Sequence, residues 1–341
     1  MTSAVLRADA SGQRVLLVKL SSLGDVVHTL PVAMDIQRAF AQVHIDWVVE
    51  RSFAPLVRRC QAVSRVIEVD LRRWRRAPLA SDTRAQWRAF LGDLRAEPYD
   101  VVLDVQGLTK SALVSRLARL TPQGQRCAMA NATEGSGYER PTRWVADVAI
   151  PMAPHSHALT RGRELAAQAL GYRFEPRPDF GLGRARGHDT PCVALVHGTS
   201  RADKEWPDPH WIALGQRLQQ SGWQLGLPHG NARERERSQR LAAALPGAQV
   251  WPALALDELT DRLAACHGVI GVDSGLSHIA VALDLPHVQI YNFDTAWRTG
   301  PIDTPHQCAV YAQPAPDVDS VWRAWRACAQ AYDARTRQGV A

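Results

Sequence analysis

Short apolar runs alternate along the chain with longer stretches in which apolar residues recur every three or four positions. In the first half, the apolar runs predict strands at 15–18, 45–49, 65–69 and 99–104. Helical spacing follows several of these runs, most clearly at 82–96 and 112–120. Val27, Leu30 and Met34 have the same spacing. Because Pro31 lies among them, we expect this helix to begin or bend near Thr29.

The second half repeats the alternation. Its predicted strands are 192–196, 223–227 and 269–272, and its predicted helices are 209–220, 234–245, 256–265, 276–283 and 321–332. Alternating strands and helices are typical of a parallel sheet covered by helices on both faces. Two such series predict an α/β fold of two doubly wound, Rossmann-like domains that face each other across a cleft.

Proline and glycine mark the boundary between the two series. Residues 171–191 contain three prolines and four glycines, which is typical of a linker. We therefore predict a first domain over 1–171, a linker over 172–191, a second domain over 192–318, and a terminal helix and tail over 319–341. Ligands of such sheets bind at the carboxyl ends of the strands. The segments after Val18, Val69 and Asp104 are therefore candidate sites.

Composition narrows the class of protein. Of the 341 residues, 46% are hydrophobic and 22% charged, which is typical of a globular chain and excludes a disordered one. No apolar run approaches the roughly 18 residues of a membrane span, and residues 1–13 have no apolar core of a secretory signal. We therefore expect a cytoplasmic protein. The six cysteines have no metal-ligand or disulfide spacing, so we expect buried thiols.

Positive charge is concentrated in the first half of the chain. Residues 1–180 carry a net charge of +7, whereas residues 181–341 carry −1. This imbalance indicates an anionic partner of the first half, such as nucleic acid, a phosphorylated lipid or an acidic sugar. A solvated arginine-rich surface would give the same composition.

The segment after the first predicted strand contains a candidate base. Asp25 follows Ser21-Ser22-Leu23-Gly24, where the glycine permits a tight turn. The residues alone favour a helix-capping role for Asp25. An ionised carboxylate pointing into the cleft could instead accept a proton, and Lys19 could keep it ionised.

Two further segments of the first half follow predicted strands. Arginines at 72, 73, 75 and 76 surround Trp74, and their guanidinium groups suit phosphates and carboxylates. A solvated basic loop is the alternative, and no nucleic-acid motif accompanies the cluster. Residues 104–111 end in Lys110-Ser111 but lack the upstream glycine of a phosphate-binding P-loop. Gly181-Leu182-Gly183 lies in the linker, so it is no dinucleotide fingerprint either.

The second half offers two candidate sites for a diphosphate. After the strand at 192–196, Thr199 and Ser200 can donate hydrogen bonds and Lys204 adds a positive charge. A polar loop that caps the next helix is the alternative. After the strand at 269–272, residues 273–278 lead into a helix whose free N–H groups favour an anion. No residues have metal-ligand spacing, so we predict no metal site.

Taken together, these segments resemble glycosyltransferase family 9, the ADP-heptose transferases. The matching segments follow one another in the family's order at 19–31, 47–50, 72–76, 104–107, 199–204 and 273–278. Residues 121–155 and 291–295 depart from the family's pattern. The resemblance implies a GT-B fold and transfer of L-glycero-D-manno-heptose from ADP-heptose to Kdo of Kdo2-lipid A. It also implies inversion of the anomeric centre with neither metal nor cofactor.

The resemblance also implies a role for each matching residue. It assigns the catalytic base to Asp25. The donor-binding residues that it implies are Thr199, Ser200, Lys204, Glu234, Asp273, Ser274, Gly275, Leu276 and His278. The acceptor-binding residues that it implies are Lys19, Arg72, Arg73, Arg75, Arg76 and Gln106.

A lipid acceptor would place the enzyme on a membrane. We therefore expect a peripheral protein on the cytoplasmic face of the inner membrane, with its basic half against anionic lipid and no nucleic acid as a partner. Three alternatives stay open: a family 9 enzyme with a later core heptose or a protein as acceptor, a GT-B-like sugar-nucleotide epimerase, and a non-catalytic binder of anionic lipid or nucleic acid.

Overall fold

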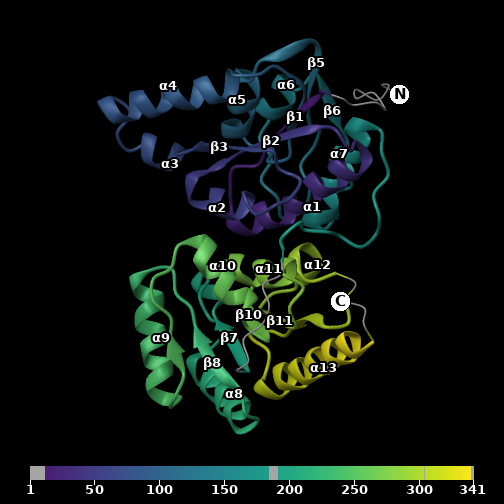
Figure 1. The fold of residues 1–341 in the computed structure, drawn as a ribbon. Helices are drawn as coiled ribbons and strands as arrows, with labels where there is room; N and C mark the ends of the chain where they lie inside the picture. Colours follow the sequence, from purple (N-terminus) through teal and green to yellow (C-terminus); the bar gives the residue numbers. More distant parts are fainter. Residues whose placement is uncertain (1–11, 184–190, 303, 339–341) are drawn as a thin grey trace. The chain divides into compact units, whose positions relative to one another are not determined.

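The chain divides into two compact units, Met1–Leu182 and Gly183–Ala341 (Figure 1). The structure, a computed structural model, describes residues 12–183, 191–302 and 304–338. The boundary between the two units falls inside the predicted linker, and residues 172–182 of that linker pack within the first unit. Phe180 is buried there, and the Gly181 carbonyl accepts a hydrogen bond from the Gln61 N–H. Residues 184–190 of that linker lie outside the described residues.

The first unit contains a six-stranded parallel sheet in the order β3-β2-β1-β4-β5-β6. Its strands are β1 (Arg14–Val18), β2 (His44–Glu50), β3 (Arg65–Val69), β4 (Tyr99–Asp104), β5 (Leu120–Met129) and β6 (Val148–Ile150). Its helices are α1 (Leu23–Ala39), η1 (Arg51–Phe53), α2 (Ala54–Val57), α3 (Leu71–Trp74), α4 (Ser81–Arg95), α5 (Thr109–Leu117), α6 (Pro141–Val145) and α7 (Ala158–Leu170).

Helices cover both faces of this sheet, so β1 is apolar throughout. Leu16 and Val18 pack in one cluster with Phe90 of α4 and Val114 of α5. The alternate residues of β1 are buried as well, and α1 packs against α7. Such double-sided burial explains why the sequence shows continuous apolar runs rather than strict alternation of apolar and polar residues.

The first helix begins earlier than the sequence predicts. The helix α1 starts at Leu23, and Pro31 lies inside it. Proline removes one backbone N–H, so the Val27 carbonyl loses its helical donor. The buried apolar residues of α1 stabilise the helix through tertiary packing in spite of that loss.

The second unit contains a six-stranded parallel sheet in the order β12-β11-β10-β7-β8-β9. Its strands are β7 (Cys192–Val196), β8 (Gln224–Leu227), β9 (Gln249–Val250), β10 (Gly268–Val272), β11 (His287–Tyr291) and β12 (Gln307–Tyr311). Its helices are η2 (Ala202–Lys204), α8 (Asp208–Gln220), α9 (Ala232–Ala244), α10 (Leu256–Ala264), α11 (Gly275–Ala282), α12 (Ala296–Thr299) and α13 (Val318–Arg337).

The terminal helix α13 belongs to this second unit. It packs against β11, β12 and α8, and its residues Val321 and Trp325 are buried in the same cluster as Leu195. In both units, each strand that precedes a candidate segment is parallel to its neighbours. The carboxyl ends of these strands therefore lie at one edge of each sheet, where doubly wound proteins bind ligands.

Candidate active site

The Asp25 side chain closes the first turn of α1, directly after β1. Its Oδ2 accepts hydrogen bonds from the Ser22 N–H at 2.9 Å and from the Ser22 hydroxyl at 2.8 Å. Its Oδ1 lies 3.5 Å from Nζ of Lys19. The capping role that the sequence favours is therefore present, and it uses only one of the two carboxylate oxygens. The other oxygen faces a cation.

These contacts determine the charge of Asp25. Burial raises the pKa of this carboxyl, but the Lys19 ammonium, the two Ser22 hydrogen bonds and His28 together outweigh burial and hold the pKa below its usual range. Asp25 is therefore ionised throughout the neutral pH range. A carboxylate that is charged and 37% exposed can accept a proton from a bound molecule.

Asp25 lines a small cavity of about 10 Å³. Two polar residues of the cavity, His28 and Arg161, were not singled out in the sequence. Arg161 reaches it from α7 and donates a hydrogen bond to the Thr133 hydroxyl at 3.1 Å. The residues that line the cavity are Lys19, Asp25, His28, Thr29, Val105, Met129, Ala158, Arg161, Gly162 and Leu165.

The segment after β4 holds the Asp25 loop in place. Oε1 of Gln106 accepts the N–H groups of Leu20 and Ser21 at 3.0 and 3.1 Å. Gln106 is buried, so its visible role is to position the loop, and contact with an acceptor stays a prediction. Nζ of Lys110 donates to the Ser21 hydroxyl at 2.7 Å. The sequence excludes Lys110 from a P-loop, yet the structure brings it to this site.

The segment after β4 is itself fixed by a buried carboxyl group. Asp104 accepts the N–H groups of Gln106 and Gly107 and the hydroxyl of Ser111. Burial raises the pKa of Asp104 to about 6, although these hydrogen bonds oppose the shift. Gly107 has φ of +80°, and a Cβ there would lie 2.6 Å from the Met129 side chain. Only glycine fits this turn without displacing Met129.

The four clustered arginines lie on and directly after α3, and their side chains are exposed. Arg73 lies 3.7 Å from Asp70. Arg72 acts electrostatically on Glu50, the last residue of β2. Burial raises the pKa of Glu50, while Lys110 and Arg72 lower it. The basic cluster therefore belongs to the same edge of the sheet as the Asp25 loop.

In the second unit, Asp273 joins the segments that follow β10 and β7. Its Oδ2 lies 2.5 Å from Nζ of Lys204, and its Oδ1 lies 3.5 Å from Nε2 of His278. The Thr199 hydroxyl donates to the Asp273 carbonyl at 3.1 Å. Burial raises the pKa of Asp273, but His278 and Lys204 outweigh it and hold the pKa below its usual range. Asp273 is therefore a fixed anion that orients the side chains of Lys204 and His278.

The Lys204 segment has a second support from the residue that follows β11. Nδ2 of Asn292 donates to the carbonyls of Asp203 and Glu205, each at 3.0 Å. Asn292 lies in the segment that departs from the family's pattern, and no sequence pattern predicts a role for it. The η2 turn that carries Lys204 is thereby fixed on both sides of the lysine.

Glu234 lies against the segment after β7. Its carboxylate accepts the Gly230 N–H at 2.7 Å, and its N–H donates to the Asn231 side chain at the start of α9. A Cβ on Gly198 would lie 2.7 Å from the Glu234 carboxyl carbon, so only glycine permits this approach. Glu234 and Thr199 therefore come to one edge of the sheet, and their contact with a donor stays a prediction. Ser200, beside them, is exposed.

The N-terminus of α11 begins at Gly275 next to Asp273. Ser274 is the N-cap residue, and its hydroxyl lies 3.4 Å from the Ser277 hydroxyl but caps no backbone N–H of the helix. The N–H groups of the first turn, including those of Gly275 and Leu276, are thus not capped by that side chain. Such N–H groups, with the helix dipole, favour an anion. The Lys204 ammonium pairs with Asp273 and so brings a positive charge to the N-terminus of α11.

Neither a metal cluster nor a membrane-spanning helix is evident in the described ranges. Over residues 12–183, 191–302 and 304–338, no group of three or more His, Cys, Asp or Glu side chains is placed to hold a metal ion. Over the same ranges, no helix combines the length and the apolar character that crossing a bilayer requires.

Two Rossmann-like units with polar strand-end segments are the architecture of the GT-B glycosyltransferases. The same fold occurs in the solved structure of E. coli heptosyltransferase WaaC with ADP, which matches with a TM-score of 0.80 and 33% identity and covers 96% of this chain and 99% of that one. WaaC with ADP-2-deoxy-2-fluoro heptose matches with a TM-score of 0.76 and 34% identity, over 96% of this chain and all of that one.

The sequence comparisons identify the family. The family model described as glycosyltransferase family 9 (heptosyltransferase) matches residues 87–323. Lipopolysaccharide heptosyltransferase 1 of Pseudomonas aeruginosa is 41% identical over 292 residues, which are 84% of this chain and 81% of that protein. The chain belongs to glycosyltransferase family 9, the heptosyltransferases.

Proposed function

We propose that the protein transfers L-glycero-D-manno-heptose from ADP-heptose to Kdo of Kdo2-lipid A, in the synthesis of the lipopolysaccharide inner core. The transfer inverts the anomeric centre and uses no metal. The observation that carries the proposal is the ionised Asp25 carboxylate: Ser22 holds its Oδ2, and its Oδ1, 3.5 Å from Nζ of Lys19, is the oxygen that meets the acceptor. The relatives named lipopolysaccharide heptosyltransferase 1 support transfer of heptose to lipopolysaccharide, and the WaaC structure with ADP-2-deoxy-2-fluoro heptose supports an ADP-linked donor.

The chemistry requires a single base. In the proposed step, the acceptor hydroxyl oxygen bonds to the anomeric carbon as the bond from that carbon to the diphosphate oxygen breaks. The hydroxyl proton passes to Asp25, and the electron pair of the broken bond leaves with ADP. A diphosphate is a good leaving group, so the second carboxylic acid of a glycosidase is not needed. General-base assistance of this kind contributes roughly 10²–10⁴ in rate.

The donor half of the reaction belongs to the second unit. Lys204 and the N–H groups of Ser274, Gly275 and Leu276 stabilise the negative charge that develops on the departing ADP. The Asp273 carboxylate supports this arrangement because it holds Lys204 at 2.5 Å and lies beside His278. Thr199, Ser200 and Glu234 complete the proposed donor site. Each charge-stabilising donor contributes about 10²–10³ in rate.

The acceptor half belongs to the first unit. Kdo carries a carboxylate and lipid A carries phosphates, so the acceptor requires cations. Lys19 and the exposed arginines 72, 73, 75 and 76 supply guanidinium and ammonium groups of the right sign. Gln106 supports acceptor binding by fixing the backbone of the Asp25 loop. The basic first half then lies against anionic lipid, as a peripheral enzyme on the cytoplasmic face of the inner membrane.

Incubation of the protein with ADP-heptose and Kdo2-lipid A, followed by mass measurement of the lipid, tests the proposal. We expect the lipid to gain the mass of one heptosyl residue, with one ADP released for each transfer. Transfer only to an acceptor that already carries heptose, or only to a protein, would assign the enzyme to another acceptor. Conversion of the nucleotide sugar without any acceptor would instead indicate an epimerase.

A further inference from the structure

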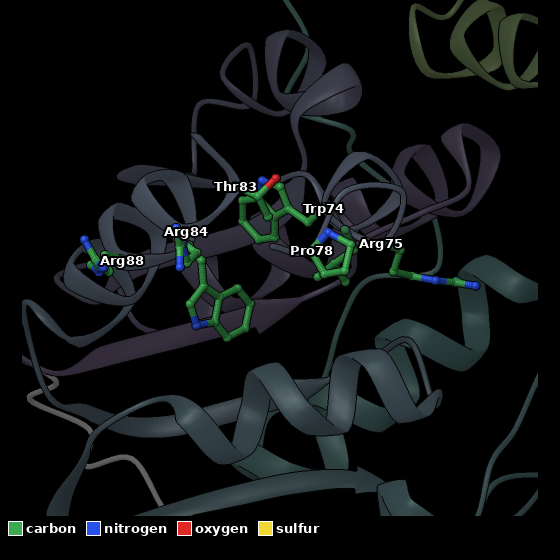
Figure 2. A pocket seen from close by; sticks show the side chains of 8 residues that line it. Trp74, Arg75, Pro78, Thr83, Arg84 and Arg88 are labelled. Atoms are coloured by element: carbon green, nitrogen blue, oxygen red, sulfur yellow. The ribbon is translucent and has the colours of Figure 1, made fainter. Parts of the chain in front are cut away.

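A second and larger cavity lies between α3 and α4, apart from the Asp25 cavity. Its volume is about 380 Å³, within the range of ligand pockets, and it shares no lining residue with the smaller cavity. Figure 2 shows its lining side chains. They are Leu71, Trp74, Arg75, Pro78, Thr83, Arg84, Trp87 and Arg88. The transfer reaction gives no role to this cavity as a whole.

The walls of the cavity are apolar and fixed. The rings of Trp74 and Trp87 meet edge to face with their centroids 5.5 Å apart, and both rings pack against Phe90. The indole nitrogen of Trp74 donates to Oε1 of Gln86 at 3.0 Å, so the polar atom of this ring already has a partner. The aromatic rings therefore present mainly carbon to the cavity. A hydrocarbon fits such walls, whereas a sugar or a nucleotide would leave its polar groups unpaired.

The rim of the cavity is cationic. In the view of Figure 2, Arg84 and Arg88 lie on one side of Trp74 and Pro78, and Arg75 lies on the other. These three side chains are exposed, and none of them forms an ion pair with any residue that the structure describes. Residues 71–88 contain six arginines and a single acidic residue, Asp82. The rim therefore complements a negatively charged headgroup.

An exposed apolar side chain adjoins the same cavity. Leu79 follows Pro78, at the cavity, and is 83% exposed. Tryptophan and arginine side chains with an apolar body and a polar end are typical of the membrane–water interface. The α3–α4 segment thus combines an apolar projection, an apolar cavity and a cationic rim over less than twenty residues.

We propose that this cavity binds one acyl chain of an anionic membrane phospholipid, with the phosphate against Arg84 and Arg88. Leu79 enters the acyl region beside it. The cavity would then anchor the first unit to the bilayer by a specific lipid contact rather than by charge alone. This inference does not depend on the identity of the sugar donor or acceptor.

The test uses the full-length protein and vesicles of phosphatidylethanolamine with phosphatidylglycerol, compared with vesicles of phosphatidylcholine alone. A second set of vesicles carries phosphatidylglycerol brominated at mid-chain, because bromine quenches tryptophan fluorescence only at close contact. We expect sedimentation with the anionic vesicles and quenching by the brominated lipid. Trp87→Phe, which keeps an aromatic wall, should bind equally well but lose a measurable part of the quenching.

The rim is tested by Arg84→Gln combined with Arg88→Gln. Each basic residue close to an anionic surface contributes roughly fivefold to partitioning. The double variant should therefore partition about twenty- to thirtyfold more weakly. Trp144→Phe and Arg143→Gln are matched controls, since both side chains are exposed in the same unit and neither lines the cavity. Thermal unfolding of each variant verifies that it is folded.

Several outcomes would overturn the inference. Binding to vesicles without quenching by mid-chain bromine would show adsorption by charge alone. Equal losses of quenching or of vesicle binding in the control variants would show that the cavity does not bind the lipid specifically. Self-association that Trp87→Ala abolishes would identify a second copy of the chain as the occupant. None of these outcomes would affect transfer of heptose, which the mass assay measures separately.

Discussion

Replacement of Asp25 by asparagine isolates the proposed base. The amide oxygen of asparagine can still accept the hydrogen bonds from Ser22, so the start of α1 should keep its cap. The change removes the oxygen that faces Lys19 at 3.5 Å and the ability to take a proton. Lys19 keeps the Val105 carbonyl as a hydrogen-bond acceptor at 3.2 Å. The substitution therefore changes the chemistry more than the fold.

The two effects differ in size. Asp25 is 37% exposed, and ion pairs near solvent contribute about 0–1 kcal/mol to stability, so unfolding should shift only slightly. Loss of the base should lower kcat by roughly 10²–10⁴, which corresponds to about 3–5 kcal/mol of barrier. Affinity for ADP-heptose should stay nearly unchanged, because the proposed donor contacts all lie in the second unit.

Release of ADP at saturating donor and acceptor measures kcat, and calorimetry measures donor affinity. Asp179→Asn is the matched control, because Asp179 is 39% exposed, pairs with Arg38 at 2.5 Å and accepts a backbone N–H from Gly181. The control should keep its turnover. If Asp25→Asn retains near wild-type turnover, or if both variants lose it equally, Asp25 is not the base.

Three further predictions concern the donor site, the stability of the second unit and metal. Lys204→Met should lower kcat about 10²–10³-fold and weaken ADP binding, as steady-state kinetics and calorimetry would measure; unchanged values would remove Lys204 from the donor site. Burial and the nearby Arg237 lower the pKa of His197 to about 4, so the unfolded state binds an extra proton between about pH 4 and 6.5. His197 should therefore contribute a fall of about 3 kcal/mol in stability as pH drops through that window, and urea unfolding of His197→Gln should lack that contribution. Turnover after treatment with EDTA should equal that of untreated enzyme, and recovery of lost turnover by a divalent cation would show that a metal takes part.

The strand-end segments were predictable from the sequence because they depend on local pattern and on one rule of topology. A buried apolar run followed by glycine, small hydroxyl residues and a helix indicates a strand-to-helix turn wherever it occurs. The rule that such turns lie at one edge of a parallel sheet then brings Lys204 and Asp273 together. Their 2.5 Å contact confirms that the two segments meet.

The remaining features depend on contacts between distant parts of the chain. Arg161 reaches the Asp25 cavity from α7, more than 130 residues after Asp25, and no local pattern distinguishes it from other helical arginines. The sequence pattern does not predict the strand β5, because Pro122 and Gly124 interrupt its apolar residues. A Cβ at Gly124 would lie 2.5 Å from the Tyr99 carbonyl oxygen. The close approach of the two backbones, and not hydrophobicity, therefore requires glycine at this position.

The central claim is that Asp25 takes the acceptor proton while the second unit holds the departing ADP. A crystal structure with ADP-heptose and a Kdo-containing acceptor analogue tests this claim most directly. We predict that one oxygen of Asp25 lies about 2.6–3.2 Å from the attacking hydroxyl. The diphosphate should lie against Lys204 and the N–H groups of Gly275 and Leu276. A nucleotide bound elsewhere, or an attacking hydroxyl out of reach of Asp25, would contradict the account.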